Sequence, residues 1–158
     1  MSDPESMETS EPAPEEFLSL SLLKLMDLSQ VLENLVEAEL ADWEILIVEL
    51  RVLAVCAVHP GITAAGISGT IPVEPPALSR LVHRLVQKGL VYRNRSRIDR
   101  REVRLRATSD GLTLLKECQI QVAQSEFEFL RPLSKAQQAS LLSAVETLLS
   151  RNYPDRES

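Results

Sequence analysis

Residues 75–106 have the sequence PPALSRLVHRLVQKGLVYRNRSRIDRREVRLR, and this stretch decides the fold. Its first part carries apolar side chains at the i, i+3, i+4, i+7 and i+8 spacing of one buried helical face. Two prolines suit the first turn of such a helix, and Gly89 suits its end. The stretch therefore predicts a helix from Pro75 to Lys88 that buries one face in a core.

The opposite face of this helix carries side chains that suit contact with DNA. Arg80 is the best candidate for reading a base, because a guanidinium can donate two hydrogen bonds to guanine. Arg84 and Lys88 lie further along the same face and are expected to approach the phosphate backbone. The full set of candidates on the helix is Pro76, Ala77, Ser79, Arg80, His83, Arg84 and Lys88.

The smaller polar side chains of this face leave more than one interpretation open. Ala77 and Ser79 suit a thymine methyl group or a phosphate, and His83 suits either of these or simple exposure to solvent. Arg80 itself has the alternative of a surface arginine that contacts a phosphate or nothing. Sequence alone does not choose between these roles.

A basic β-hairpin is expected after the helix. Two strand-like segments, residues 90–93 and 103–107, flank a long tip that is rich in arginine. Arg101 is the expected minor-groove contact, because a narrow groove concentrates negative potential. Asp99 is its expected partner, which would hold the tip by charge-assisted hydrogen bonds. Phosphate contacts are expected from Arg95, Arg97 and Arg100, with the alternative that one or two of them only solvate the loop.

Charge is strongly polarised along the chain. The whole chain has 17 Lys and Arg against 23 Asp and Glu, a formal net charge of −6. Residues 70–106 alone hold ten basic and three acidic side chains, a net charge of +7, which leaves −13 for the rest. Such polarity repels a polyanion from most of the surface and attracts it to one element, which favours nucleic-acid binding. The alternative is a hairpin whose charge serves only solubility.

Length and composition predict one soluble globular domain. The 158 residues with 44% apolar content can bury one core, and no apolar run approaches the length of about 20 residues that a membrane crossing needs. Cys56 and Cys118 are far apart in apolar, helix-like sequence, so we expect reduced, buried thiols in a cytoplasmic protein.

Catalysis has little support in the sequence. His59 and His83 are the only histidines, no glycine loop is arranged to cradle a phosphate, and no cluster has the spacing of metal ligands. We therefore expect no enzyme, no metal and no cofactor. Trp43 has two interpretations, a side chain of an effector pocket or, more commonly for a large ring at a helix start, a core residue.

Helices are expected on both sides of the basic stretch. The first runs from about residue 17 to 40 and is apolar on more than one stripe, which is typical of a helix that packs on two sides. Asp42 is the expected cap of a second helix, 43–58, and Thr63 of a short third one, 64–71. After the hairpin come a helix over 109–130 and an apolar last helix capped by Ser134.

Five short motifs follow one another in this chain: HPGITAA at 59–65, PPALSRLV at 75–82, QKGLV at 87–91, DRR at 99–101 and LRATSDG at 105–111. In this order and spacing they resemble the MarR family of winged-helix regulators, over about Trp43 to the last helix. The resemblance implies a fold that is mainly α with a small β-hairpin wing. The sequence departs from the family pattern at Gly66 and Gly69, where the family usually has acidic or other helix-favouring residues, and at Pro72, which replaces a turn glycine. Each interior glycine costs a helix roughly 1 kcal/mol relative to alanine.

The resemblance also implies an organisation of the chain. We expect a disordered acidic arm over 1–16, an N-terminal dimerisation helix over 17–42, a winged helix-turn-helix DNA-binding lobe over 43–108, C-terminal dimerisation helices over 109–151 and a flexible tail over 152–158. The apolar terminal helices favour pairing with a second copy. Burial of their faces within one subunit is the alternative.

By the same resemblance the protein would be a homodimeric transcriptional regulator, most often a repressor, on a pseudo-palindromic site in double-stranded DNA. A small amphipathic or phenolic effector would bind between the dimer part and the winged lobe, at residues that the sequence does not identify. The competing hypothesis is a protein-interaction module that uses its basic hairpin on an acidic partner, which the two glycines of the third helix slightly favour.

Overall fold

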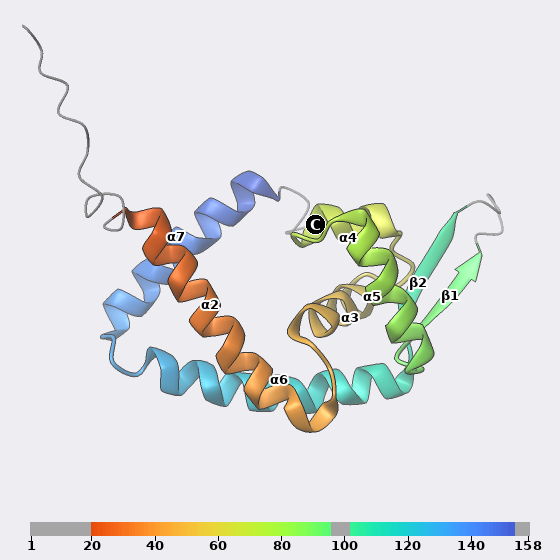
Figure 1. Cartoon of the computed structure of the whole chain (residues 1–158), viewed down its shortest axis with the longest axis horizontal. Helices are drawn as coiled ribbons and strands as arrows, with labels where there is room; N and C mark the ends of the chain where they lie inside the picture. Colours follow the sequence, from red (N-terminus) through yellow and green to blue (C-terminus); the bar gives the residue numbers. More distant parts are fainter. Residues whose placement is uncertain (1–19, 96–101, 154–158) are drawn as a thin grey trace, which may run out of the picture. The chain divides into compact units, whose positions relative to one another are not determined.

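The structure, a computed structural model, describes residues 20–95 and 102–153, except for the side chain of Arg95. Its elements are α2 (Ser21–Leu40), a 3-10 turn (Ala41–Trp43), α3 (Ile47–Val58), α4 (Ala64–Thr70), α5 (Pro75–Gln87), β1 (Val91–Arg95), β2 (Val103–Ala107), α6 (Ser109–Leu130) and α7 (Lys135–Asn152). The predicted fold class, mainly α with a small β-hairpin, is confirmed (Figure 1). The expected acidic arm, 1–16, lies outside the described residues.

The chain divides into two compact units, Met1–Leu35 and Val36–Ser158. The second unit contains what we call the winged lobe, namely α3, α4, α5 and the β1–β2 hairpin. Its core lies between α3 and α5, with Leu53 of α3 and Leu85 of α5 fully buried. Burial of one such leucine side chain contributes about 1.5–3 kcal/mol.

The apolar face predicted for α5 is confirmed. Leu78, Leu81, Val82 and Leu85 are all buried, and the helix begins with two prolines at its first positions. It ends before Gly89, whose φ of 72° lies in the left-handed region that favours glycine. The face that α5 turns to solvent is therefore the one with Arg80 and His83.

The short helix α4 is capped as predicted, because the Thr63 hydroxyl accepts a hydrogen bond from the Gly66 amide at 3.2 Å. Gly66 has a packing reason for its place in the helix. A Cβ at this position would lie 2.8 Å from Cγ1 of Ile62, closer than packed carbon atoms tolerate. Close approach of the Ile62 side chain thus accounts for one of the two unexpected glycines.

The start of α3 differs from the prediction. Asp42 does not cap it; residues 41–43 form a 3-10 turn, Glu44 has a left-handed φ of 50°, and α3 begins only at Ile47. The physical reason is a more distant carboxylate, since Glu37 Oε1 accepts the Ile47 amide at 2.8 Å. Trp43 packs against the core, and its Nε1 donates to Glu117 at 3.3 Å, which agrees with a core role.

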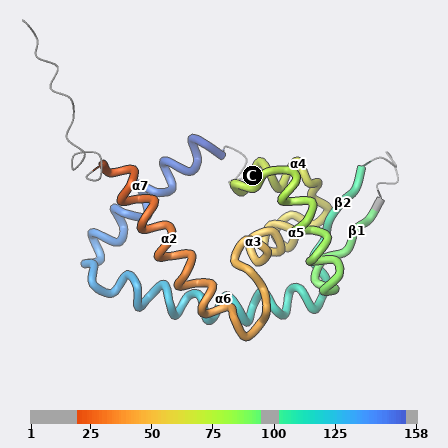
Figure 2. The backbone as a smooth tube through the Cα atoms, viewed as in Figure 1, coloured from red at the N-terminus to blue at the C-terminus, as the bar shows by residue number. Residues whose placement is uncertain are grey.

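The hairpin is joined to the rest of the winged lobe along β2. β1 and β2 pair antiparallel with Arg93 opposite Leu105, and β1 extends two residues beyond the predicted strand. On the outer side of β2, Leu105 exchanges backbone hydrogen bonds with Gly61 at 2.8 Å and Ile62 at 2.9 Å. Figure 2 follows the backbone from β2 directly into α6.

The first turn of α6 packs tightly against the end of α5. Thr108 caps α6 by accepting the Gly111 amide at 3.0 Å, and its own amide donates to Leu90 O at 2.9 Å. A Cβ on Gly111 would lie 2.2 Å from Leu90 O. Only glycine fits this crossing without movement of the backbone.

The last helix begins as predicted, with a capping box between Ser134 and Gln137. The cysteines Cys56 and Cys118 are free and buried, and burial raises the pKa of the Cys56 thiol to about 12. No helix in residues 20–95 or 102–153 is both long and apolar enough to span a bilayer.

Candidate nucleic-acid interface

The solvent face of α5 presents a compact group of polar side chains. Ser79, Arg80 and His83 are exposed, and Pro76 is exposed in the first turn, whereas Ala77 is only half-buried. Within the described part of the chain, Arg80 and His83 have no ion-pair partner. The charge of Arg80 and the hydrogen-bonding groups of both side chains are thus available to an external ligand.

A hollow of about 490 Å³ connects this face of α5 with the hairpin. It is lined by Ser79, Arg80, His83, Arg84 and Arg93, and so contains three arginines and no acidic side chain. An open, cationic hollow of this composition suits the backbone and base edges of a nucleic acid.

Arg93 is a residue of this hollow that sequence reasoning did not single out. It lies on β1 opposite Leu105, which is buried, and residues directly opposite in an antiparallel pair share one face of the sheet. Arg93 therefore lies on the α5 side of the hairpin. The signal in the sequence was its spacing of two from the buried Val91.

Most of the expected contacts at the hairpin tip lie outside the described residues, namely Arg97, Asp99, Arg100 and Arg101. Arg95 ends β1, and its side chain is likewise not described. At the end of β2 that is next to the tip, Arg104 forms an ion pair with Glu102 at 3.0 Å. The roles predicted for the tip remain predictions.

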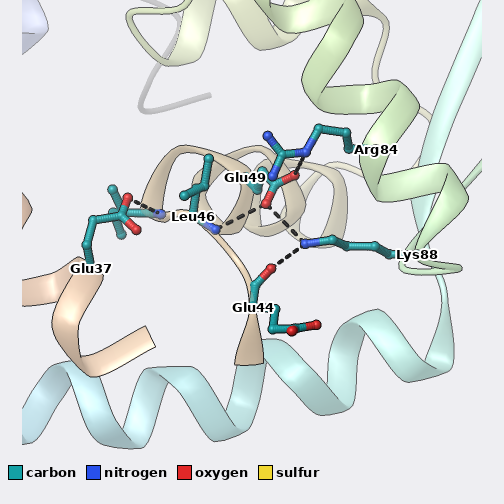
Figure 3. Close-up of polar contacts among 7 residues, drawn as sticks. Glu37, Glu44, Leu46, Glu49, Arg84 and Lys88 are labelled. Atoms are coloured by element: carbon teal, nitrogen blue, oxygen red, sulfur yellow. Dashed lines mark hydrogen bonds and ion pairs between the residues drawn. The ribbon is translucent and has the colours of Figure 1, made fainter. Parts of the chain in front are cut away.

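The C-terminal part of α5 is arranged differently from its N-terminal part. Arg84 Nε lies 2.9 Å from Oε1 of Glu49 on α3, and Lys88 Nζ lies 3.4 Å from Oε2 of the same carboxylate. Lys88 also donates to the backbone carbonyl of Glu44 (Figure 3). Both cations expected at DNA phosphates thus have partners within the chain, and Glu49 was not recognised from the sequence.

Two further hollows in the second unit are mainly apolar. One of about 470 Å³ lies between α3 and α6, where Leu50, Ala54, Leu115 and Val122 line it together with polar residues including Glu126. The other, of about 590 Å³, lies between α4, α5 and the hairpin. Volumes of a few hundred Å³ with apolar walls suit small molecules. Among the described residues, no group of three or more His, Cys, Asp or Glu side chains is placed to hold a metal ion.

Comparison with known proteins places these elements in a family context. The sequence profile of the MarR family matches residues 46–103, which include α3, α4, α5 and β1. A putative transcriptional regulatory protein for the hcr operon of Thauera aromatica is 28% identical over 96 residues. The alignment covers 61% of this chain and 58% of that protein.

Solved structures agree with this match. A mutant MarR from E. coli complexed with operator DNA has a TM-score of 0.77 and 26% identity, and the likeness covers 88% of this chain and 99% of that one. The PcaV transcriptional regulator from Streptomyces coelicolor, in complex with its natural ligand, has a TM-score of 0.77 over 89% of this chain and 98% of its own. At 21% identity, this second likeness concerns the fold alone.

Proposed function

Because residues 46–103 match the MarR family and the fold resembles a MarR bound to operator DNA, we propose that the chain is a homodimeric transcriptional regulator of this family that binds double-stranded DNA through α5 and the hairpin. The observation that carries this proposal is the cationic hollow formed by α5 and β1. It lies in the stretch of net charge +7 within a chain whose other residues sum to −13. Attraction of a polyanion is thereby concentrated on one element.

Side chains of α5 and of the hairpin have separate roles in this proposal. Arg80 reads a guanine in the major groove, and Ala77 and Ser79 contact a thymine methyl group or a phosphate. Arg93 contacts the phosphate backbone from the hairpin side, since it lines the same hollow. At the tip, Arg101 enters the minor groove with Asp99 as its partner, and Arg95, Arg97 and Arg100 contact phosphates.

The dimer forms through the terminal helices. In a single chain, large apolar side chains are exposed on α2, α6 and α7, among them Met26, Phe127 and Leu148. Exposed apolar area of this extent is unfavourable in water, and pairing with a second copy removes it. A two-fold dimer presents two α5 helices to half-sites about one helical turn apart, which requires a pseudo-palindromic operator.

The protein is a repressor that a small effector releases. The apolar hollow between α3 and α6 is the proposed effector site, because it adjoins α3, the helix on which α5 packs. Its apolar walls and polar rim suit an amphipathic or phenolic molecule. We expect no catalytic activity, and we place the protein with its DNA in the cytoplasm.

The alternative function, a protein-interaction module that binds an acidic partner, has less support than DNA binding. It drew on the glycines of the third predicted helix, yet α4 is a formed helix and Gly66 closely approaches Ile62. No observation in the described residues favours an acidic protein partner over DNA.

The test is selection of bound duplexes from a random pool, followed by titration of the selected duplex at several salt concentrations. We expect an enriched pseudo-palindrome, affinity that falls steeply between about 50 and 200 mM salt, and relaxed preference at one base pair for Arg80→Ala, worth about 1–3 kcal/mol. Arg151→Ala, which removes an exposed arginine from α7, is the matched control and should leave base preference unchanged. Absence of any enriched sequence, or affinity independent of salt, would contradict the proposal.

A further inference from the structure

We propose that Glu49 is a positioning residue for DNA recognition: it holds Arg84 and Lys88 against α3, sets the orientation of α5, and leaves only the N-terminal part of α5 to contact DNA. This inference rests on the proposed function. It assigns the two C-terminal cations of α5 to a contact within the chain instead of to the phosphate backbone.

Glu49 is a charged residue inside the winged lobe. Its side chain is fully buried, in the first turn of α3 and within the core of the winged lobe. A carboxylate removed from water is costly unless it is paired and hydrogen-bonded. In this position the chain must supply its partners, and α5 supplies two of them.

Two cationic side chains and one backbone amide lie around the Glu49 carboxylate. Oε1 lies 2.9 Å from Arg84 Nε, and Oε2 accepts the Leu46 amide at 3.1 Å and lies 3.4 Å from Lys88 Nζ (Figure 3). Oε1 receives no well-aligned hydrogen bond from the described residues, so its contact with Arg84 is an ion pair. The carboxylate also lies near the N-terminus of α3, where the helix dipole stabilises negative charge.

The two cations that pair with Glu49 come from one side of α5. Arg84 and Lys88 are four residues apart and therefore lie one above the other on the same side of the helix. Lys88 is further held by the Glu44 carbonyl, in the segment just before α3. Two contacts one helical turn apart resist both rotation of α5 about its axis and sliding along α3.

Pairing with Glu49 reduces the positive charge that the C-terminal part of α5 offers to DNA. The side chains of Arg84 and Lys88 are 45% and 33% exposed, but the charged groups of both contact a carboxylate. Loss of that carboxylate would free two cations for any phosphate and would release the constraint on α5. Correct orientation favours the cognate sequence, whereas free cations favour every sequence alike.

The experiment measures affinity against salt for the selected duplex and for an unrelated duplex. Lys88→Met should leave the slope of log affinity against log salt unchanged, whereas a phosphate contact would lower it by about 0.9. Glu49→Gln should weaken cognate binding at least tenfold and leave unrelated binding equal or stronger. Glu44→Gln is the matched control, because Lys88 donates to the backbone carbonyl of Glu44, which the substitution keeps. This variant should change neither the ratio of the affinities for the selected and the unrelated duplex nor the slope of log affinity against log salt.

If Glu49→Gln does not fold, a triple variant, Glu49→Met with Arg84→Met and Lys88→Met, tests whether Arg84 and Lys88 contact phosphates. Apolar replacement of a whole buried ion cluster is often tolerated, so this variant should fold. Its slope should stay within about 0.5 of the wild-type slope, whereas two phosphate contacts would remove about 1.8. A loss of that size, or equal weakening of both duplexes by Glu49→Gln, would overturn the inference while leaving the proposed function intact. If the wild-type chain binds no duplex, the proposed function itself fails and takes the inference with it.

Discussion

In the winged lobe most large apolar side chains of α3 and α5 are buried, whereas many of those on α2 and α7 are exposed in the same chain. Leu53 and Leu85 have no accessible surface, but Leu22 of α2 is 72% exposed and Leu148 of α7 is 56% exposed. Both groups have helical apolar spacing, so spacing alone does not distinguish them. The difference teaches that one group completes its packing within the chain, whereas the other keeps the apolar surface that the proposed dimer would cover.

This difference has a consequence for stability. The free energy of unfolding of the lobe should depend on its own packing, whatever the protein concentration. Association through α2 and α7 in the proposed dimer should depend on protein concentration, because it is a reaction between two chains. Substitutions in the two regions therefore test the comparison directly.

Gly111→Ala should have the largest effect. The new Cβ would lie 2.2 Å from Leu90 O, so either α6 or the end of α5 must move. We expect a loss of more than about 4 kcal/mol in the free energy of unfolding, at the upper end of what overpacking costs, and little folded protein. Urea denaturation followed by circular dichroism measures it.

Gly89→Ala is the control for this prediction. Its Cβ meets nothing within 4 Å, but φ is 72°, so only the backbone conformation is unfavourable and about 1–2 kcal/mol should be lost. Equal losses in the two variants would show that the crossing of α6 over Leu90 is not tightly packed.

Leu85→Ala should be next in size. Leu85 is fully buried between α5 and α3, and the deletion leaves a cavity in the lobe core, which costs about 2–5 kcal/mol. Chemical denaturation at two protein concentrations tests both the loss and its expected independence of concentration. A loss that varied with concentration would contradict the view that this core is complete in one chain.

The contrast between the regions also explains what the sequence could and could not predict. The buried face of α5 follows from spacing within 13 residues, and the caps Thr63, Thr108 and Ser134 each accept a hydrogen bond from the amide three residues further along. Such short-range patterns are complete in the sequence itself. For these elements the predictions agree closely with the structure.

Long-range contacts were missed for the opposite reason. Glu49 looks in the sequence like an ordinary charge on an amphipathic helix, and its partners lie 35 and 39 residues further along. Glu37 displaced Asp42 as the cap of α3 across ten residues. Arg84 and Lys88 were correctly placed on the polar face of α5, but the sequence contains no local sign of the carboxylate that binds them.

Leu148→Glu should act on association and not on the lobe. Leu148 is exposed in the single chain, so the substitution costs the lobe little, but in a dimer interface it would bury a charge without a partner. We expect the dimer dissociation constant to rise at least tenfold, or about 1.4 kcal/mol, in sedimentation equilibrium. Ser140→Glu adds the same charge at an exposed polar position of α7 and should have no such effect. An unchanged dimer would move the interface away from this face of α7.

The smallest expected effect on the free energy of unfolding comes from the Cys56 thiol, and it reports whether the core of the winged lobe excludes water. Burial raises its pKa from the ordinary 9.0 to about 12, so above pH 9 the thiol ionises in the unfolded chain but not in the folded one. The unfolded chain is thereby favoured, and this thiol should lower the free energy of unfolding as pH rises from 9 towards 12. Relative to Cys56→Ala, the wild-type protein should lose about 1.4 kcal/mol between pH 8 and pH 10. A difference between the two proteins that stays constant over this range would mean that water reaches Cys56, and that the lobe, like α2 and α7, depends on a partner to exclude solvent.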